Sequence, residues 1–214
     1  MTGAPRRGTR RVPLVTVLAA TAMMAAGCKA RDAAPTPAAA AAAVAVAVAA
    51  GGDFTLTDHN AQRFALQSLR GTVVMIFFGY STCPDVCPTT LSKLSRVTKR
   101  LGPQQGKVKT LYITVDPDRD TPAALKADLA LFDLDALGLT GTRQEIDTVV
   151  AQYGASYEIV PTPQSAGKYS VSHSTTLYVL DAKGVLRRSF PYEATVDEIV
   201  QGLEPLIAEA GAGR

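Results

Sequence analysis

The arrangement of apolar and polar positions divides the chain into three parts. An arginine-rich start is followed by an apolar run over residues 12–26, and residues 33–50 contain 12 alanines. From residue 53 onward, short apolar runs alternate with stretches in which apolar residues recur at helical spacing. This pattern predicts one folded domain over residues 53–214, preceded by two non-globular segments.

Within this domain, the pattern predicts alternating strands and helices. The expected strands are 54–58 and 63–66 as a small hairpin, 73–78, 109–115, and 175–180 with 185–190 as a second hairpin. The expected helices are 88–101, 122–132, 142–153 and about 196–210. The continuous apolar run Val73–Phe78 is typical of a strand that is buried on both faces. The element order βαβαα, then ββα, predicts an α/β, thioredoxin-like fold: a central mixed sheet flanked by helices, with an added N-terminal β-hairpin and an inserted helix.

The first segment has the pattern of a secretory signal peptide. Four arginines and no acid precede the apolar run, which is shorter than the ~20 residues of a membrane span. The junction Ala25-Ala26-Gly27-Cys28 resembles a bacterial lipobox, with alanine where leucine is usual three residues before the cysteine. We expect removal of residues 1–27, lipidation of Cys28, and an exported, membrane-anchored domain that faces the periplasm or cell exterior. The alternative is ordinary cleavage that leaves Cys28 as a free thiol. Either way, the domain works where disulfides persist.

The alanine-rich segment, residues 28–52, is expected to be a flexible tether between the anchor and the domain. It has low complexity and ends in two glycines. Its Ala/Val stretch is too short and too weakly apolar to cross a bilayer. Such a segment serves as a spacer, so we expect no chemistry in it.

The charge of the chain gives no reason to expect a nucleic-acid partner. The sequence carries 22 basic and 19 acidic side chains, a formal net charge of +3. Four of the basic side chains lie in the predicted signal peptide, which leaves 18 against 19 and a net charge of −1. A nearly neutral domain has no strong electrostatic attraction to nucleic acid.

Two of the three cysteines lie between the first core strand and the helix that follows it. Cys83 and Cys87 are four residues apart, and four helical positions rise about 6 Å. Their sulfurs are therefore close enough to form a disulfide or to share one metal ion. A helix N-terminus favours thiolate over thiol, which both redox chemistry and metal binding require.

The two histidines have different surroundings in the sequence. His173 is expected in a loop at the entrance to strand 175–180, which in a thioredoxin-like fold faces the cysteine-bearing helix. Two thiolates and one imidazole suit copper, as Cu(I) or Cu(II), whereas a structural zinc site would take a fourth protein ligand. The alternative is a structural disulfide beside an unrelated surface histidine. His59 is expected to be a solvent-exposed turn residue and not a ligand.

Three longer motifs resemble those of the Sco/SenC family. They are Phe77-Phe-Gly-Tyr-Ser-Thr-Cys-Pro-Asp-Val-Cys-Pro-Thr89, Val115-Asp-Pro-Asp-Arg-Asp-Thr-Pro122 and Ser172-His-Ser-Thr-Thr-Leu-Tyr-Val-Leu-Asp181. The resemblance covers roughly residues 53–208. It implies a membrane-tethered copper chaperone, and not a turnover enzyme, that helps to assemble the binuclear copper site (CuA) of cytochrome c oxidase. The implied partners are the copper-bearing oxidase subunit or another periplasmic copper chaperone.

When the family's ligands are transferred to the matching positions of this sequence, the resemblance implies that Cys83, Cys87 and His173 are the copper ligands. It also implies that the two cysteines form a redox pair, so a thiol–disulfide reductase that keeps the client's cysteines reduced is the second hypothesis. A general oxidoreductase is disfavoured by the C-x3-C spacing and by Val171-Ser-His173, which replaces the cis-proline loop of thioredoxins. A thiol peroxidase fits neither cysteine, since the peroxiredoxin pattern P-x3-[TS]-x2-C is absent and the chain has no tryptophan.

The charged residues of the second motif have two possible roles. Asp116, Asp118, Arg119 and Asp120 follow a core strand, and turn formation and capping of the next helix explain them. They could instead form a charged rim that positions the site loops or meets a partner. None of them is expected to be a direct ligand. Asp85, between the cysteines, could orient the site or touch the metal weakly.

Overall fold

The computed structural model describes residues 51–162 and 169–212. The predicted signal peptide, Cys28 and most of the predicted tether lie outside these residues. Gly51 and Gly52, which end that segment, hydrogen-bond to the domain. The Gly51 N–H donates to the Gln152 carbonyl (3.1 Å), and the Tyr153 hydroxyl donates to the Gly52 carbonyl (3.0 Å). Among the described helices, none combines the length and the apolar character needed to cross a membrane.

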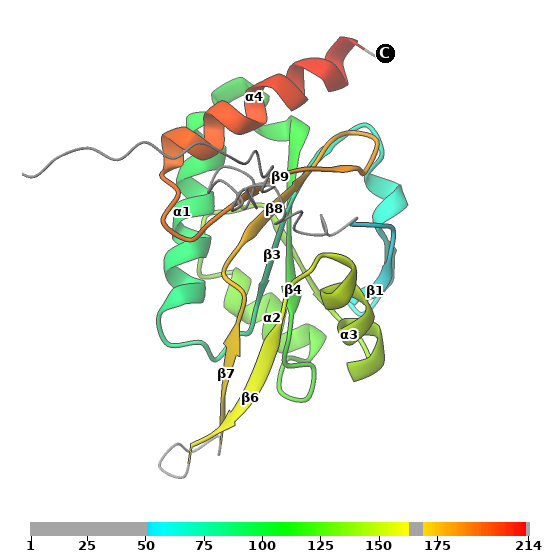
Figure 1. The fold of residues 1–214 in the computed structure, drawn as a ribbon, viewed down its shortest axis with the longest axis vertical. Helices are drawn as coiled ribbons and strands as arrows, with labels where there is room; N and C mark the ends of the chain where they lie inside the picture. Colours follow the sequence, from blue (N-terminus) through cyan, green and yellow to red (C-terminus); the bar gives the residue numbers. More distant parts are fainter. Residues whose placement is uncertain (1–50, 163–168, 213–214) are drawn as a thin grey trace, which may run out of the picture. The chain divides into compact units, whose positions relative to one another are not determined.

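A seven-stranded mixed sheet forms the centre of the domain, in the order β2-β1-β5-β4-β3-β8-β9 (Figure 1). Strands β3, β4 and β5 are parallel to one another, and β8 runs antiparallel to β3. A separate two-stranded antiparallel sheet consists of β6 and β7. The strands are β1 (Thr55–Asp58), β2 (Arg63–Ala65), β3 (Val73–Gly79), β4 (Val108–Thr114), β5 (Ala136–Thr140), β6 (Tyr157–Pro161), β7 (Tyr169–His173), β8 (Leu177–Leu180) and β9 (Leu186–Phe190).

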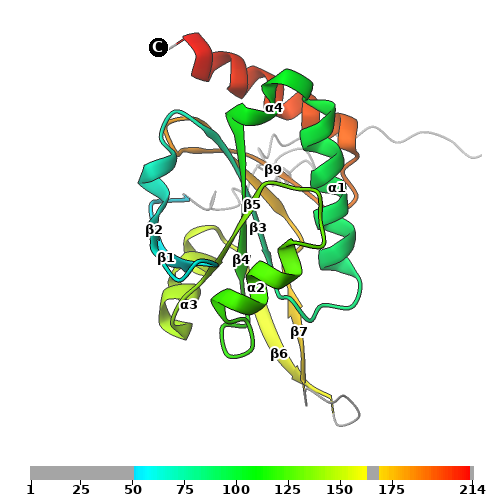
Figure 2. The same ribbon diagram turned by 180° about the vertical axis from the view of Figure 1, so that it is seen from behind.

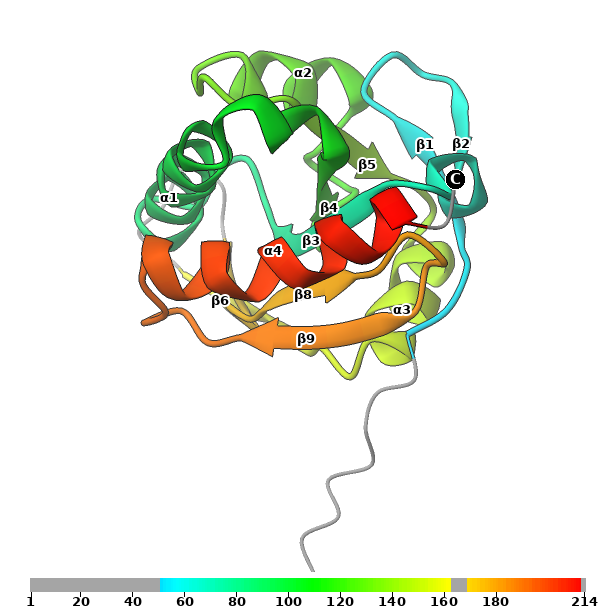
Figure 3. The ribbon, with the colours of Figure 1, turned by 90° about the horizontal axis from the view of Figure 1, so that it is seen from above.

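Helices cover both faces of this sheet. The helices are α1 (Val86–Arg100), α2 (Pro122–Leu129), α3 (Arg143–Gln152) and α4 (Val196–Ala212), with short 3-10 helices at Leu66–Leu69 and Gly102–Lys107. Helices α1 and α2 lie on one side of the sheet and α3 on the other, as Figures 2 and 3 show. Helix α4 packs against α1 and β3. This arrangement confirms the predicted mixed sheet flanked by helices, and β1 with β2 is the predicted N-terminal hairpin.

The elements form where local sequence signals and burial agree. All seven residues of β3 are buried, as expected for a continuous apolar run between two sheet neighbours. Helix α1 buries Leu91, Leu94 and Val97 at helical spacing. Thr121 caps α2 by accepting the Ala124 N–H (3.2 Å). Because β3 and α1 are both anchored in the core, the segment between them, which carries Cys83, has two fixed ends.

Strand β5 is absent from the sequence-based prediction. It lies between α2 and α3, so the expected pair of consecutive helices is wrong and the order is βαβαβα. Its Ala136 and Gly138 have low strand propensity, and pairing with β4 and β1 stabilises it instead. Gly138 also permits close packing of α2, since a Cβ there would lie 3.1 Å from the Cβ of Leu125.

Strands β6 and β7 were also not predicted, and together they form a two-stranded ribbon. The ribbon projects beyond the end of the main sheet, on the side where the β3–α1 segment lies (Figures 1 and 2). In β7 the residues Tyr169, Val171 and His173 alternate with serines, so these three side chains share one face. The expectation that His173 lies in a loop is therefore wrong, because it is the last residue of β7.

Candidate metal centre

Cys83, Cys87 and His173 come together in the structure, although they belong to three different elements. Cys83 lies in the segment between β3 and α1, Cys87 in the first turn of α1, and His173 at the end of β7. One ligand atom from each residue lies within 4.8 Å of the other two. The Cys87 Sγ is 3.5 Å from the His173 Nε2. Neither cysteine forms a disulfide in this structure.

The two sulfurs differ in how deeply they are buried. Cys87 is 2% exposed and belongs to the main core cluster, whereas Cys83 is half-buried. Gly79, the last residue of β3, makes the position of Cys87 possible. A Cβ at Gly79 would lie 2.9 Å from the Cys87 Sγ and 2.6 Å from the Cε2 of Tyr112. The glycine is therefore required by the close approach of α1 and β4 at this point.

The imidazole of His173 is oriented by contacts on its other side. Its Nδ1 lies 2.9 Å from the carbonyl oxygen of Ser174. A carbonyl can only accept, so Nδ1 carries the proton and the neutral ring presents a lone pair at Nε2, toward the sulfurs. The ring also packs edge-on against Phe77 and Tyr80, with centroid distances of 6.1 and 5.8 Å. These contacts fix both the tautomer and the direction of a possible ligand atom.

The two thiols have opposite pKa shifts. A hydrogen bond from the Cys87 thiol lowers the pKa of Cys83 to about 3, with further contributions from the backbone N–H groups of Asp85 and Cys87. The pKa of Cys87 is raised, because its thiol donates that hydrogen bond and because it is buried. The prediction of a thiolate at the helix start therefore holds for Cys83 and not for Cys87. The pair is a thiolate and a thiol that share one proton.

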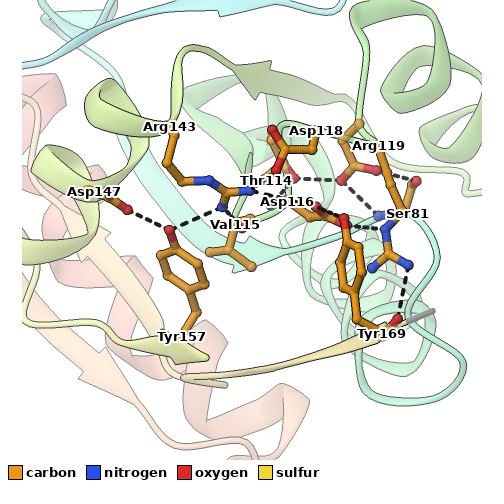
Figure 4. Close-up of polar contacts among 11 residues, drawn as sticks. Ser81, Thr114, Val115, Asp116, Asp118, Arg119, Arg143, Asp147, Tyr157 and Tyr169 are labelled. Atoms are coloured by element: carbon orange, nitrogen blue, oxygen red, sulfur yellow. Dashed lines mark hydrogen bonds and ion pairs between the residues drawn. The ribbon is translucent and has the colours of Figure 1, made fainter. Parts of the chain in front are cut away.

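The charged residues of the second motif do not form a rim. Asp116 and Asp120 are fully buried, so the alternative of a charged rim is wrong for both, whereas the Arg119 and Asp120 N–H groups donate to the Asp116 carbonyl as expected for a turn. Asp120 accepts the Ser81 N–H (3.0 Å), the Ser81 hydroxyl and the Thr114 hydroxyl (2.6 Å). Asp116 accepts the hydroxyl of Tyr169 (2.8 Å), as Figure 4 shows. These carboxylates bind the segments that carry the cysteines and the histidine, which agrees with the predicted positioning role.

The remaining charged residues of the motifs lie nearer to solvent. Asp118 is exposed and pairs with Arg143 (2.7 Å), and Arg119 pairs with Asp116. Asp85 is exposed directly before α1, and its side chain makes no capping hydrogen bond. Its backbone N–H is the part of the residue that acts on Cys83.

His59 is half-buried, which corrects the expectation that it is exposed. Its Nδ1 accepts the backbone N–H of Gly138 in β5 (3.3 Å), and burial lowers its pKa. The unpredicted strand β5 explains this difference, because it lies beside the β1–β2 turn. His59 is not part of the Cys83–Cys87–His173 cluster.

Comparison with known proteins places this geometry in a family. The model of the SCO1/SenC family matches residues 43–208, which is most of the chain. This chain belongs to the SCO1/SenC family. A SCO2-like protein of Rickettsia conorii is 35% identical to it over 153 residues, covering 72% of this chain and 75% of the relative.

Solved structures agree with the family and with the predicted thioredoxin-like fold. The structure of Bradyrhizobium japonicum ScoI with copper bound is similar, with a TM-score of 0.67 and 39% identity over 73% of this SCO1/SenC chain and 99% of that chain. The crystal structure of yeast Sco1 with copper bound has a TM-score of 0.63 and 35% identity, covering 72% of this chain and 88% of that chain.

Sequence reasoning missed several residues that shape the site of this SCO1/SenC protein. Tyr80 and Phe77 flank the imidazole, and Tyr112 lies behind Cys87. Tyr169 links β7 to the second motif. Two signals were available: a glycine at the end of an apolar strand indicates a close approach, and the alternation from Tyr169 to His173 indicates a strand.

Proposed function

We propose that this chain is a copper chaperone that holds copper through Cys83, Cys87 and His173. It delivers that copper to, or prepares, the CuA site of cytochrome c oxidase. The observation that carries the proposal is the convergence of two sulfurs and one imidazole nitrogen within 4.8 Å in a member of the SCO1/SenC family.

The chemistry of this donor set suits copper as a cargo. Thiolate sulfurs and an imidazole are ligands that both Cu(I) and Cu(II) accept. A structural zinc site has four protein ligands, and this cluster offers three. The His173 Nε2 offers its lone pair without rearrangement, because Nδ1 already holds the proton. Copper binding must displace the proton that the two thiols share, so affinity increases with pH. Half-buried Cys83 is the sulfur that an incoming client ligand reaches first.

A thiol–disulfide reductase remains the second candidate, and the asymmetry of the two thiols favours it. The thiolate of Cys83 could attack a client disulfide and release one client sulfur as a thiolate. Cys87 would then lose its proton, displace the second client sulfur and form the Cys83–Cys87 disulfide. The client gains two electrons, and the two cysteines lose them. Both candidates need the reduced pair, so they do not exclude each other.

Copper titration of the reduced protein tests the proposed site. We expect one copper ion per chain, and we expect Cu(II) to show thiolate-to-copper charge-transfer absorption. Cys83→Ser and Cys87→Ser should each abolish that absorption. Equal copper binding and an unchanged band in both variants would refute the site.

The variant His173→Ala separates delivery from reduction. Substitution of a residue that only orients a metal ligand typically lowers metal affinity ~10–100-fold. His173→Ala should weaken copper binding by more than this, because it removes a direct ligand. The Cys83–Cys87 disulfide should still form and be reduced. Failed oxidase assembly with active thiols supports delivery, whereas intact assembly would make the reductase the main function.

We also propose the anchoring and partners that the sequence predicts. Lipidated Cys28 would hold the exported domain at a membrane, where the domain would face the periplasm or cell exterior. Its partner would be the copper-bearing oxidase subunit or another copper chaperone. Cys28→Ser should move the protein from the membrane fraction to the soluble one. An unchanged membrane fraction would argue against lipidation.

A further inference from the structure

Within the described residues, the proposed ligands are attached to two separate sheets. The cysteines follow β3, in the middle of the seven-stranded sheet, whereas His173 ends β7 in the two-stranded ribbon. No strand of the ribbon pairs with a strand of the main sheet. Apart from the short connection of residues 174–176 to β8, which pairs with β3, side-chain contacts therefore set the distance between the imidazole and the sulfurs.

The loop between β4 and α2 makes such contacts with β7. The Tyr169 hydroxyl donates to the Asp116 Oδ1 (2.8 Å), and the Arg119 Nη1 donates to the Tyr169 carbonyl (3.1 Å). The Arg119 guanidinium carbon lies 3.9 Å from the centroid of the Tyr169 ring, and its Nε donates to Asp116. Figure 4 shows the tyrosine pointing from its strand toward this carboxylate. The side chain and backbone of Tyr169 are thus both held by one buried acid and its arginine partner.

The same loop also holds the cysteine-bearing segment. Asp120, four residues after Asp116, accepts the backbone N–H and the hydroxyl of Ser81, two residues before Cys83. One short loop therefore contacts both parts of the proposed site. A buried carboxylate with several donors is a stiff connection, because losing a donor leaves an unsatisfied acceptor in a low-dielectric region.

Tyr169 acts on the same face of β7 that carries the imidazole. Side chains two apart along a strand share a face, so Tyr169, Val171 and His173 point to the same side. Val171, between them, is 5% exposed, which confirms that this face packs against the domain. A shift of Tyr169 on Asp116 therefore moves the strand that carries His173 relative to the sulfurs.

We infer that Tyr169 is a positioning residue for copper binding: its hydrogen bond to Asp116 holds the β7 strand so that His173 Nε2 faces Cys83 and Cys87. The inference rests on the proposed copper site. It assigns no ligand role to Tyr169. Its effect reaches the metal only through the imidazole, as for partners that orient the ligands of other metal sites.

The test uses Tyr169→Phe, which removes the hydroxyl and keeps the ring on Arg119. We expect copper affinity to fall ~10–100-fold and the Cu(II) charge-transfer spectrum to shift, while disulfide formation between the cysteines is unchanged. Tyr192→Phe is the matched control, since that tyrosine lies beside Lys93 of α1 and not on the ribbon. It should bind copper like the unmodified protein.

A double-mutant cycle separates positioning from general destabilisation. In the His173→Ala background, Tyr169→Phe should cause no further loss of affinity, because the group it positions is gone. An equal further loss in that background would overturn the inference, as would unchanged affinity and spectrum in Tyr169→Phe alone. If Tyr169→Phe does not fold, Arg119→Lys tests the same attachment of Tyr169 to the loop through its second bond, since it removes the guanidinium donor to the Tyr169 carbonyl and should also weaken copper binding.

These outcomes are distinguishable from failure of the proposed function. If the unmodified protein binds copper and His173→Ala weakens it, the site stands, and Tyr169→Phe decides the inference. If His173→Ala binds copper normally, the proposed site is wrong and the inference falls with it.

Discussion

The cysteine segment and the β6–β7 ribbon contribute to one site but are built in different ways. Cys87 lies in the main core with 2% exposure, in the first turn of α1 and against Gly79 at the end of β3. His173 ends a ribbon whose outer strand is exposed over four of its five residues. The thiols are therefore placed by close packing, and the imidazole by polar contacts together with the packing of its ring and of Val171.

This difference suggests which changes should matter most in each region. Packing tolerates little change in volume, so substitutions near Cys87 should cost stability as well as alter the thiols. The ribbon contacts the domain through Tyr157, Tyr169 and His173, and these contacts are directional. Substitutions there should change geometry at the site more than global stability. The following predictions test this contrast, beginning with the largest expected effect.

Asp120→Ala should cause the largest loss of stability, because it affects the packed region. It removes a fully buried carboxylate and leaves the Ser81 N–H and the Thr114 hydroxyl without their acceptor. We expect the free energy of unfolding to fall by ~3 kcal/mol, as for other broken buried polar networks. Denaturant unfolding of the purified reduced protein measures this loss.

Asp118→Ala is the control for that substitution, in the same loop. Asp118 is 69% exposed and pairs with Arg143 at the surface. Its removal should cost less than ~1 kcal/mol. Similar losses for the two variants would show that the loop is not the stiff connection described above.

The packed region was largely predictable from sequence because its signals are local. The continuous apolar run of β3, the helical spacing in α1 and the threonine before α2 each indicate their element without knowledge of distant residues. Strand β5 was not predictable in this way, because Gly138 and Ala136 do not favour a strand. Its pairing with β4 and β1 is a long-range effect that only the folded chain supplies.

The residues of the site also differ in how far the sequence could predict them. The residue types of Cys83, Cys87 and His173 indicated soft-metal chemistry, and the motif order indicated that they meet. The partners that hold them did not follow from the sequence. Asp120 binds Ser81, 39 positions earlier, and Tyr169 binds Asp116, 53 positions earlier. Contacts of this range depend on the tertiary fold, so the burial of Asp116 and Asp120 did not follow from the sequence.

Gly79→Ala should have the next largest effect, and it tests close packing directly. The added Cβ would lie 2.6 Å from a ring carbon of Tyr112 and 2.9 Å from the Cys87 Sγ, so both must move. We expect a loss of ~1–3 kcal/mol in unfolding free energy, as for other overpacked cores. We also expect a changed alkylation rate of Cys87.

Gly106→Ala provides the comparison, since nothing lies within 4 Å of a Cβ at that position. Its stability should stay within about 0.5 kcal/mol of the unmodified protein, as for most surface substitutions. An equally stable Gly79→Ala protein with normal thiol reactivity would mean that α1 is not tightly packed against β3 here.

The smallest expected effect is a pH dependence that comes from the cysteine pair. Folding lowers the pKa of Cys83 from 9.0 to about 3, so between these values the unfolded chain holds a proton that the folded chain has released. Stability from this group therefore rises with pH up to the unfolded pKa and is lost as pH falls toward the folded pKa.

Cys83→Ser keeps the size of the side chain and removes the titration. Between pH 7 and 8.5, the metal-free reduced protein should gain stability relative to Cys83→Ser. The slope should be below the ~1.4 kcal/mol per pH unit of one full proton, because the thiol of the unfolded chain also begins to lose its proton as the pH approaches 9.0. Parallel pH profiles of the two proteins in denaturant unfolding would show that Cys83 is not a thiolate in the folded state.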